Sequence, residues 1–159
     1  MITGKNQIGN TLSATGIITF TTYNPELDKE NDVVFTEATQ EEIEQALSLA
    51  TDAFKEFRNI SGKKKAEFLN AIADEILALD DTLVKTYCFE TGLPEGRAKG
   101  ERGRTVGQLR SFANLVEEGS WVEATIDKAQ PNREPMPKVD IRKMNIPLGP
   151  VVVFGASNF

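Results

Sequence analysis

The stretch that decides the fold is Ile146-Pro147-Leu148-Gly149-Pro150-Val151-Val152-Val153-Phe154-Gly155-Ala156-Ser157-Asn158-Phe159, the last part of the 159-residue sequence. Its four consecutive bulky apolar residues at 151–154 predict a strand buried on both faces, as in the interior of a parallel sheet. The small and polar run at 155–158 predicts the loop at the carboxyl end of that strand, where open α/β sheets bind ligands. No residues follow to form the next helix or neighbouring strands, so we expect the chain to be a piece of a larger protein.

Composition limits the classes of function that the chain can have. The sequence is 40% hydrophobic and 26% charged, which is enough for a soluble domain with a core. Its formal charge of −6 argues against nucleic-acid binding, which needs clustered lysine and arginine. The two short basic clusters, Lys63-Lys64-Lys65 and Arg102-Gly103-Arg104, stand close to acidic residues, so we favour solvated helix faces over phosphate sites for both.

The cysteine and histidine counts exclude several mechanisms within this chain. It has one cysteine, Cys88, and no histidine. A Ser-His-Asp or Cys-His nucleophile, a histidine-based zinc site and a CxxC redox pair are therefore excluded, and no metal site is predicted. Cys88 has no base or cation near it in sequence, so we interpret it as a packing thiol.

Cysteine usage and hydropathy also predict the compartment. An intrachain disulfide is impossible with one cysteine, which suits a reducing environment. No apolar run approaches the roughly 20 residues needed to span a bilayer, and the amino terminus lacks the apolar core of a secretory signal. We therefore expect a soluble, cytoplasmic protein with no membrane association.

The first 36 residues have the composition of short strands and turns. Ile8-Gly9-Asn10 predicts a turn, and the β-prone runs at 17–21 and 33–36 predict two strands. Tyr23-Asn24-Pro25 is expected to break the first of them.

From residue 39 the pattern changes to helical. Thr39 and Glu42 form a capping-box pattern, followed by an apolar stripe from Ile43 to Phe57. Ser61 and Asp80 are predicted caps of a second and a third helix, with stops at Gly92 and Pro94. Helices so close in sequence are expected to pack as neighbours joined by short loops.

A fourth helix is predicted over 94–118, with a proline in its first turn and Gly119 at its end. Four glycines share one face of it, each costing roughly 1 kcal/mol relative to alanine; they are Gly96, Gly100, Gly103 and Gly107. We expect close approach by another backbone to compensate, since such a face has no side chains to hold a neighbour away. A phosphate-binding loop is disfavoured because the spacing fits no such motif and no buried strand precedes it.

The next segment predicts a projecting arm. Two strands are expected over 121–126 and 139–144, joined by a proline-containing stretch with no helical period. The edges of such an arm are suited to pairing with another subunit. Trp121, the only tryptophan, is predicted to anchor the arm to the helices.

Several of these motifs resemble the aldehyde dehydrogenase superfamily. Residues 147–159 resemble its first cofactor-binding strand and the following loop, and Tyr23-Asn24-Pro25 resembles its early "NP" element. The helix at Thr39 is similar to its "A…AF" helix. Glu90-Thr91-Gly92-Leu93-Pro94 resembles its "E-x-G-K-P" turn, with Leu93 in place of the common lysine.

Within the superfamily, two segments look most like the 2-oxoglutarate semialdehyde (2,5-dioxopentanoate) dehydrogenases. They are residues 100–113, with the sequence GERGRTVGQLRSFA, and the tail Phe154-Gly155-Ala156-Ser157-Asn158-Phe159. The resemblance implies an α/β fold, the N-terminal part of a subunit with a doubly wound NADP (or NAD) domain. Residues 1–121 would be the strands and four helices of the cofactor-binding domain, 122–145 a β arm for homo-oligomerisation, and 146–159 the first cofactor-binding strand and loop.

The resemblance also implies a reaction. A nucleophilic cysteine attacks a small aldehyde, hydride passes to NADP+ or NAD+, and a glutamate-activated water releases the acid. Asn158 matches the asparagine whose amide helps to bind the oxyanion of the thiohemiacetal, whereas from the residues alone it serves equally well as a turn residue. Phe154, Gly155, Ala156 and Ser157 match the loop along the cofactor, although most members have Pro-Trp at 156–157.

The remaining parts of the family's machinery are not found in this sequence. The nucleophilic cysteine and the glutamate lie beyond residue 159 in the family, and Cys88 does not match the nucleophile. We therefore expect the chain alone to be inactive and not to bind the cofactor. Two other hypotheses remain at this stage: a binding module that pairs its arm with a full-length subunit, and a helical adaptor unrelated to redox chemistry.

Overall fold

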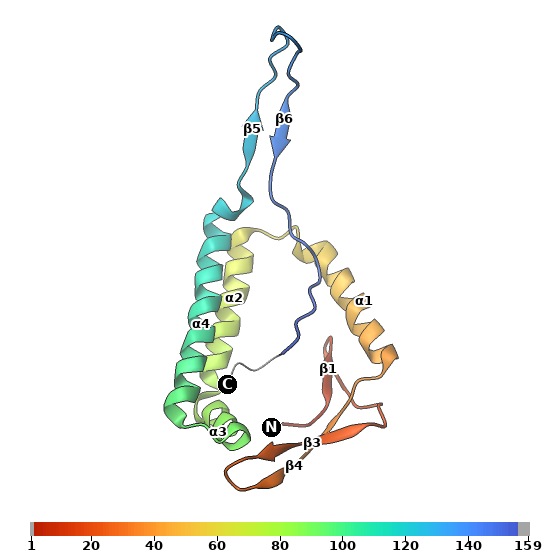
Figure 1. Cartoon of the computed structure of the whole chain (residues 1–159), viewed down its shortest axis with the longest axis vertical. Coiled ribbons are helices and arrows are strands. Elements are labelled where there is room, and N and C mark those ends of the chain that lie inside the picture. Colours follow the sequence, from red (N-terminus) through yellow and green to blue (C-terminus); the bar gives the residue numbers. More distant parts are fainter. Residues whose placement is uncertain (1, 156–159) are drawn as a thin grey trace.

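Helices α2 (Gly62–Ala78) and α4 (Glu95–Glu118) lie side by side and antiparallel in the computed structural model, which describes residues 2–155 (Figure 1). Their contact forms most of the buried apolar core. It is sealed by small side chains with at most 6% exposure, namely Ala66 and Ala73 of α2 and Ala98, Val106 and Ala113 of α4. Small side chains such as alanine let two helix backbones approach closely. We call this contact the α2–α4 seam.

The predicted starts of the first two helices are confirmed. Helix α1 (Gln40–Phe57) follows Thr39, whose side chain accepts from the backbone N–H of Glu42, while the Glu42 carboxylate accepts from the backbone N–H of Thr39. Helix α2 follows Ser61, whose hydroxyl accepts from the N–H of Lys64. Both caps satisfy donors that a helix start leaves unpaired.

The prediction that Asp80 caps the third helix is wrong. Helix α2 ends at Ala78 with Leu79 as its C-cap, and Leu79 is also the N-cap of α3 (Asp80–Thr91), so Asp80 is already inside the third helix. No loop separates the two helices, and Asp80 takes a left-handed φ of 40° at the junction. The predicted stops at Gly92 and Gly119 are confirmed, since both have positive φ.

The N-terminal part consists of two antiparallel hairpins. Strands β1 (Asn6–Ile8) and β2 (Thr11–Ser13) flank the predicted turn, and β3 (Thr19–Asn24) pairs with β4 (Lys29–Thr36). The two predicted strands are thus present. The first runs on to Asn24, and its turn begins only at Pro25.

The arm projects beyond the upper ends of α2 and α4 in Figure 1. It begins with a single turn of 3-10 helix, η1 (Ser120–Val122), and contains the short antiparallel strands β5 (Thr125–Asp127) and β6 (Ile141–Lys143). A bridge between Gln130 and Lys138 continues the pairing toward the tip. The predicted hairpin is confirmed, with shorter strands.

The predicted buried strand at 151–154 is not formed. Residues 146–155 run between α1 and the α2–α4 pair without regular secondary structure, and the side chains at 151–154 are 65–89% exposed (Figure 1). A strand exists through hydrogen bonds to its neighbours, and no described strand pairs with this segment. Gly149 does rest on the ring of Phe54 in α1, where an added Cβ would lie 3.6 Å from Phe54 Cε1.

Two packing predictions also fail within the described residues. A Cβ built on each of the four α4 glycines would meet nothing within 4 Å, so no backbone approaches that face. Helix α1 stands apart from α2 and α4, and only Glu42 of α1 is buried (Figure 1). The apolar stripe of α1 therefore stays largely uncovered.

Candidate functional site

The structure places two of the predicted site residues at the end of the tail. Phe154 is 89% exposed, and a Cβ on Gly155 would meet nothing within 4 Å. Ala156, Ser157 and Asn158, the remaining cofactor-loop and catalytic predictions, lie outside the described residues. Cys88 is half-buried on α3, and no group of three or more His, Cys, Asp or Glu side chains in residues 2–155 could hold a metal ion.

Two motifs that are far apart in sequence meet in the fold. The side-chain Oδ1 of the buried Asn24 accepts from the backbone N–H groups of Glu26 and Leu27, both at 3.0 Å. These bonds fix the turn after β3 and place Pro25 against Gly92, where an added Cβ would lie 2.9 Å from Pro25 Cγ. The "NP" element thereby holds the end of α3, a contact that no pattern in the sequence predicted.

A buried carboxylate joins the first hairpin to α1. Glu42 is 5% exposed and accepts from the Ser13 hydroxyl, from the Thr39 N–H at 2.8 Å and from the Thr15 N–H at 3.5 Å. The Ser13 hydroxyl, followed by the Thr39 N–H, holds the pKa of Glu42 below its usual value. These bonds stabilise the charged form, so Glu42 is suited to a structural role.

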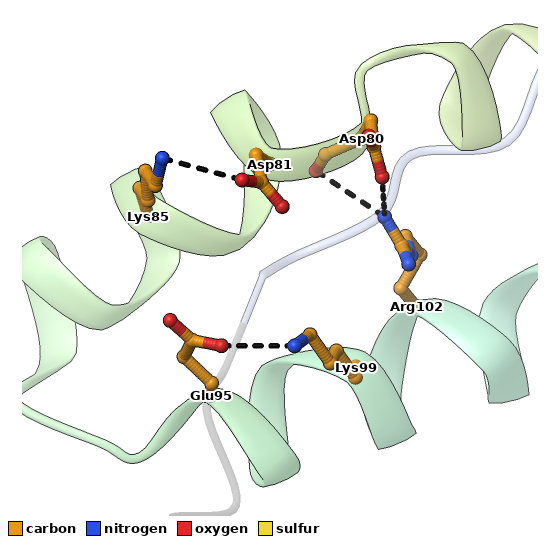
Figure 2. Close-up of polar contacts among 6 residues, drawn as sticks. All are labelled: Asp80, Asp81, Lys85, Glu95, Lys99 and Arg102. Carbon is orange, nitrogen blue, oxygen red and sulfur yellow. Dashed lines mark hydrogen bonds and ion pairs between the residues drawn. The ribbon is translucent and has the colours of Figure 1, made fainter.

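The cluster Arg102-Gly103-Arg104 does not form a phosphate site. The Arg102 side chain is only 18% exposed, and its Nη1 lies 3.2 Å from the Asp80 carbonyl oxygen and 3.7 Å from the Asp80 carboxylate (Figure 2). Arg104 forms an ion pair with Glu101 at 2.7 Å. The interpretation as a solvated helix face fits Arg104 and is wrong for Arg102, which connects the α2–α3 junction to α4.

The root of the arm contains a groove that the sequence did not predict. Asn145 closes the base of the arm, because its backbone N–H donates to the Val122 carbonyl at 2.8 Å and its side chain donates to the Trp121 carbonyl at 2.9 Å. Beside this junction, the ends of α1 and α4 and the start of α2 enclose a groove of about 510 Å³. No local pattern marks it, because it is formed by segments from 58 to 147.

Comparison with known proteins gives the family. Residues 12–159 match the aldehyde dehydrogenase family. The chain belongs to the aldehyde dehydrogenase family. This membership contradicts the hypothesis of a helical adaptor unrelated to redox chemistry.

Two curated relatives of this aldehyde dehydrogenase chain have the same kind of name. The chain is 48% identical over 159 residues to alpha-ketoglutaric semialdehyde dehydrogenase 2 of Azospirillum brasilense, covering 99% of the chain and 30% of the relative. It is 45% identical over 126 residues to alpha-ketoglutaric semialdehyde dehydrogenase of Acinetobacter baylyi, covering 79% of the chain and 24% of that relative. The chain thus spans at most about a third of the length of these relatives.

Solved aldehyde dehydrogenases share the fold. An NAD-dependent benzaldehyde dehydrogenase from Corynebacterium glutamicum superposes with a TM-score of 0.72 at 16% identity, over 82% of this chain and 28% of that one. The predicted α/β fold of an N-terminal aldehyde dehydrogenase segment is therefore confirmed. In the described part of the chain, no helix has the length and apolar character to cross a membrane.

Proposed function

We propose that this chain forms the N-terminal part of a subunit of an NADP+- or NAD+-dependent dehydrogenase that oxidises 2-oxoglutarate semialdehyde to the dicarboxylate. The observation that carries this proposal is the 48% identity to an alpha-ketoglutaric semialdehyde dehydrogenase over 99% of the chain. The similarity of residues 100–113 and of the tail to that subgroup points the same way. The enzyme would work in the reducing cytoplasm.

Each of the three segments has its own role in this proposal. Residues 1–121 supply the strands and four helices of the cofactor-binding domain, and 146–159 supply its first cofactor-binding strand and loop. Residues 122–145 supply an arm for homo-oligomerisation. Two observations support this role for the arm. All six residues of β5 and β6 are exposed, and among the described residues each of these strands pairs only with the other.

The described end of the tail fits one wall of a cofactor site. The backbone at Gly155 is open on the side where a Cβ would point, so a flat ligand can lie against it. Phe154, Gly155, Ala156 and Ser157 would line NADP+ or NAD+, which supplies the hydride acceptor when bound. The rest of that site would come from the remainder of the subunit, so the chain alone would not hold the cofactor.

Asn158 has the catalytic role in this proposal. Its side-chain amide donates a hydrogen bond to the oxyanion that forms when the thiolate adds to the aldehyde. Because this charge develops during the reaction, the donor stabilises the transition state more than the substrate. The thiolate and the base that activates water belong to the remainder of the subunit, so the chain alone is inactive.

The test is a steady-state assay of the full-length protein with 2-oxoglutarate semialdehyde and succinate semialdehyde, each with NADP+ and NAD+. We expect the highest kcat/KM with 2-oxoglutarate semialdehyde and no turnover by residues 1–159 alone. The variant Asn158→Ala should lower kcat by roughly 10²–10³-fold, as is typical for the loss of an oxyanion donor. Asn10→Ala, in the exposed first turn, is the control and should keep wild-type kcat.

Three results would contradict the proposal. Turnover by the chain alone would overturn the assignment of the nucleophile to the remainder. Unchanged kcat in Asn158→Ala would overturn its role at the oxyanion. A full-length enzyme that prefers succinate semialdehyde would overturn the substrate.

A further inference from the structure

The groove at the arm root differs from the other cationic regions of the chain. Arg58, Lys63 and Lys65 all line it, against a single carboxylate from Glu117. No ion pair joins any of these four side chains to another residue within 2–155. The groove therefore has an excess of uncompensated positive charge in a chain whose formal charge is −6.

Two of the three cations, Arg58 and Lys65, are held by contacts that leave their charge unpaired. The Lys65 ammonium donates to the Arg58 carbonyl at 3.3 Å and lies 5.7 Å from the centre of the Phe57 ring. The Arg58 guanidinium lies 5.1 Å from the centre of the Phe54 ring. Aromatic rings and a carbonyl orient these cations without neutralising them, so an anion can still interact with each.

Apolar side chains also line the groove. Val116, Trp121 and Pro147 line both the groove and an adjoining hollow of about 220 Å³, which Phe57, Arg58 and Lys65 line as well. The position of Trp121 is fixed by the bond from Asn145 to its carbonyl. A hollow of this combined size can take a small molecule, since ligand pockets measure roughly 300–1,000 Å³.

We propose that the groove at the arm root binds a small organic anion, with its phosphate or carboxylate toward Arg58, Lys63 and Lys65 and its apolar part against Trp121. The sequence alone favoured a solvated face for Lys63-Lys64-Lys65. The structure changes that interpretation for Lys63 and Lys65, because they line one groove together with Arg58 and with apolar side chains. Lys64 does not line the groove.

The binding site includes none of residues 154–158 of the proposed dehydrogenase site, although Ile146 and Pro147 of the same segment line it. Its position suits a ligand that stiffens the arm. The groove is lined by residues from both ends of the arm, Val122 and Met144, and by the ends of three helices, so a ligand bound there would contact all of these segments.

The experiment uses the fluorescence of Trp121, the only tryptophan, in the 159-residue chain. Phenyl phosphate is the probe, with inorganic phosphate and phenol as its charged and apolar halves. We expect a saturable change in emission with phenyl phosphate, with binding roughly tenfold tighter than that of inorganic phosphate, because the phenyl group buries apolar surface against Trp121. Added salt should weaken it by screening the charges.

Two variants with the same charge change isolate the groove. Lys63→Gln should weaken phenyl phosphate binding by roughly threefold, the scale of one exposed charge pair. Lys64→Gln should leave it unchanged, and circular dichroism checks that both fold as the parent does. The proposal is overturned if phenyl phosphate gives no saturable change at millimolar concentrations, if phenol binds as tightly, or if both variants lose the same affinity.

Discussion

The α2–α4 seam and residues 151–154 of the tail are both apolar, but among the described residues only the seam is buried against another element. Ala73 and Ala113 are 0% exposed in the seam, whereas Val153 of the tail is 84% exposed. The tail is the more hydrophobic segment by sequence, so hydrophobicity alone does not determine burial. A segment is buried only where another element has a matching surface, so we expect the seam to contribute far more to the stability of this chain than residues 151–154 do.

The largest expected effect comes from overfilling the seam. Ala73→Leu adds volume where two backbones meet, and overpacking of this kind costs about 3 kcal/mol at the upper end of its usual range. Ala71→Leu makes the same change at an exposed position of α2 and should stay within about 0.5 kcal/mol of the parent. Urea denaturation followed by circular dichroism measures both, and equal losses would mean that the seam is not the core.

A smaller effect is expected at the end of the seam. A Cβ on Gly62 would lie 2.2 Å from the Val116 carbonyl oxygen, so Gly62→Ala must separate α2 from α4 and should cost about 2 kcal/mol. Gly100→Ala faces nothing within 4 Å and should instead stabilise the chain by about 1 kcal/mol through helix propensity. Thermal denaturation of Gly62→Ala and Gly100→Ala, each compared with the parent, measures both effects. A loss in Gly100→Ala would show that a backbone does cover the glycine face.

The pH dependence of stability provides a third test, at Glu42, which joins the first hairpin to α1. The folded-state pKa of Glu42 is lowered, so its contribution to stability is present above its unfolded pKa near 4.5 and is lost as the pH falls through the folded value. Glu42→Gln should reduce the melting temperature at neutral pH and flatten its decline in acid. Glu41→Gln, at the exposed neighbouring position, should keep the parent's decline. Identical pH profiles for the parent and Glu42→Gln would contradict the role of this carboxylate.

The sequence could predict the features that depend on local chemistry. The capping box at Thr39, the Ser61 cap and the stops at Gly92 and Gly119 each involve residues within a few positions of one another, and each was confirmed. The Asp80 cap failed because the α2–α3 junction has no loop, which depends on how two helices join.

The candidate site was harder to predict for the same physical reason. The residues of the proposed cofactor loop are contiguous and could be recognised as a motif. The contact of Pro25 with Gly92 and the groove at the arm root join distant segments, and no spacing in the sequence encodes them. The strand at 151–154 was predicted from composition, but a strand also needs neighbours.

The smallest effect on stability is expected in the tail. Val152→Ser changes a side chain that is 65% exposed, so the free energy of unfolding should move by no more than about 0.5 kcal/mol. The same change removes exposed apolar surface and should reduce self-association, measured by sedimentation velocity. A loss of stability comparable to that of Ala73→Leu would show that the tail belongs to the core of this chain.

The most direct test of the account is amide hydrogen exchange, compared between residues 1–159 alone and the full-length subunit. The account predicts slow exchange in α2 and α4 in both proteins. It predicts fast exchange at residues 151–155 in the chain alone and slow exchange there in the full subunit, where the strand would gain its neighbours. Slow exchange at 151–155 in the chain alone, or fast exchange there in both proteins, would contradict it.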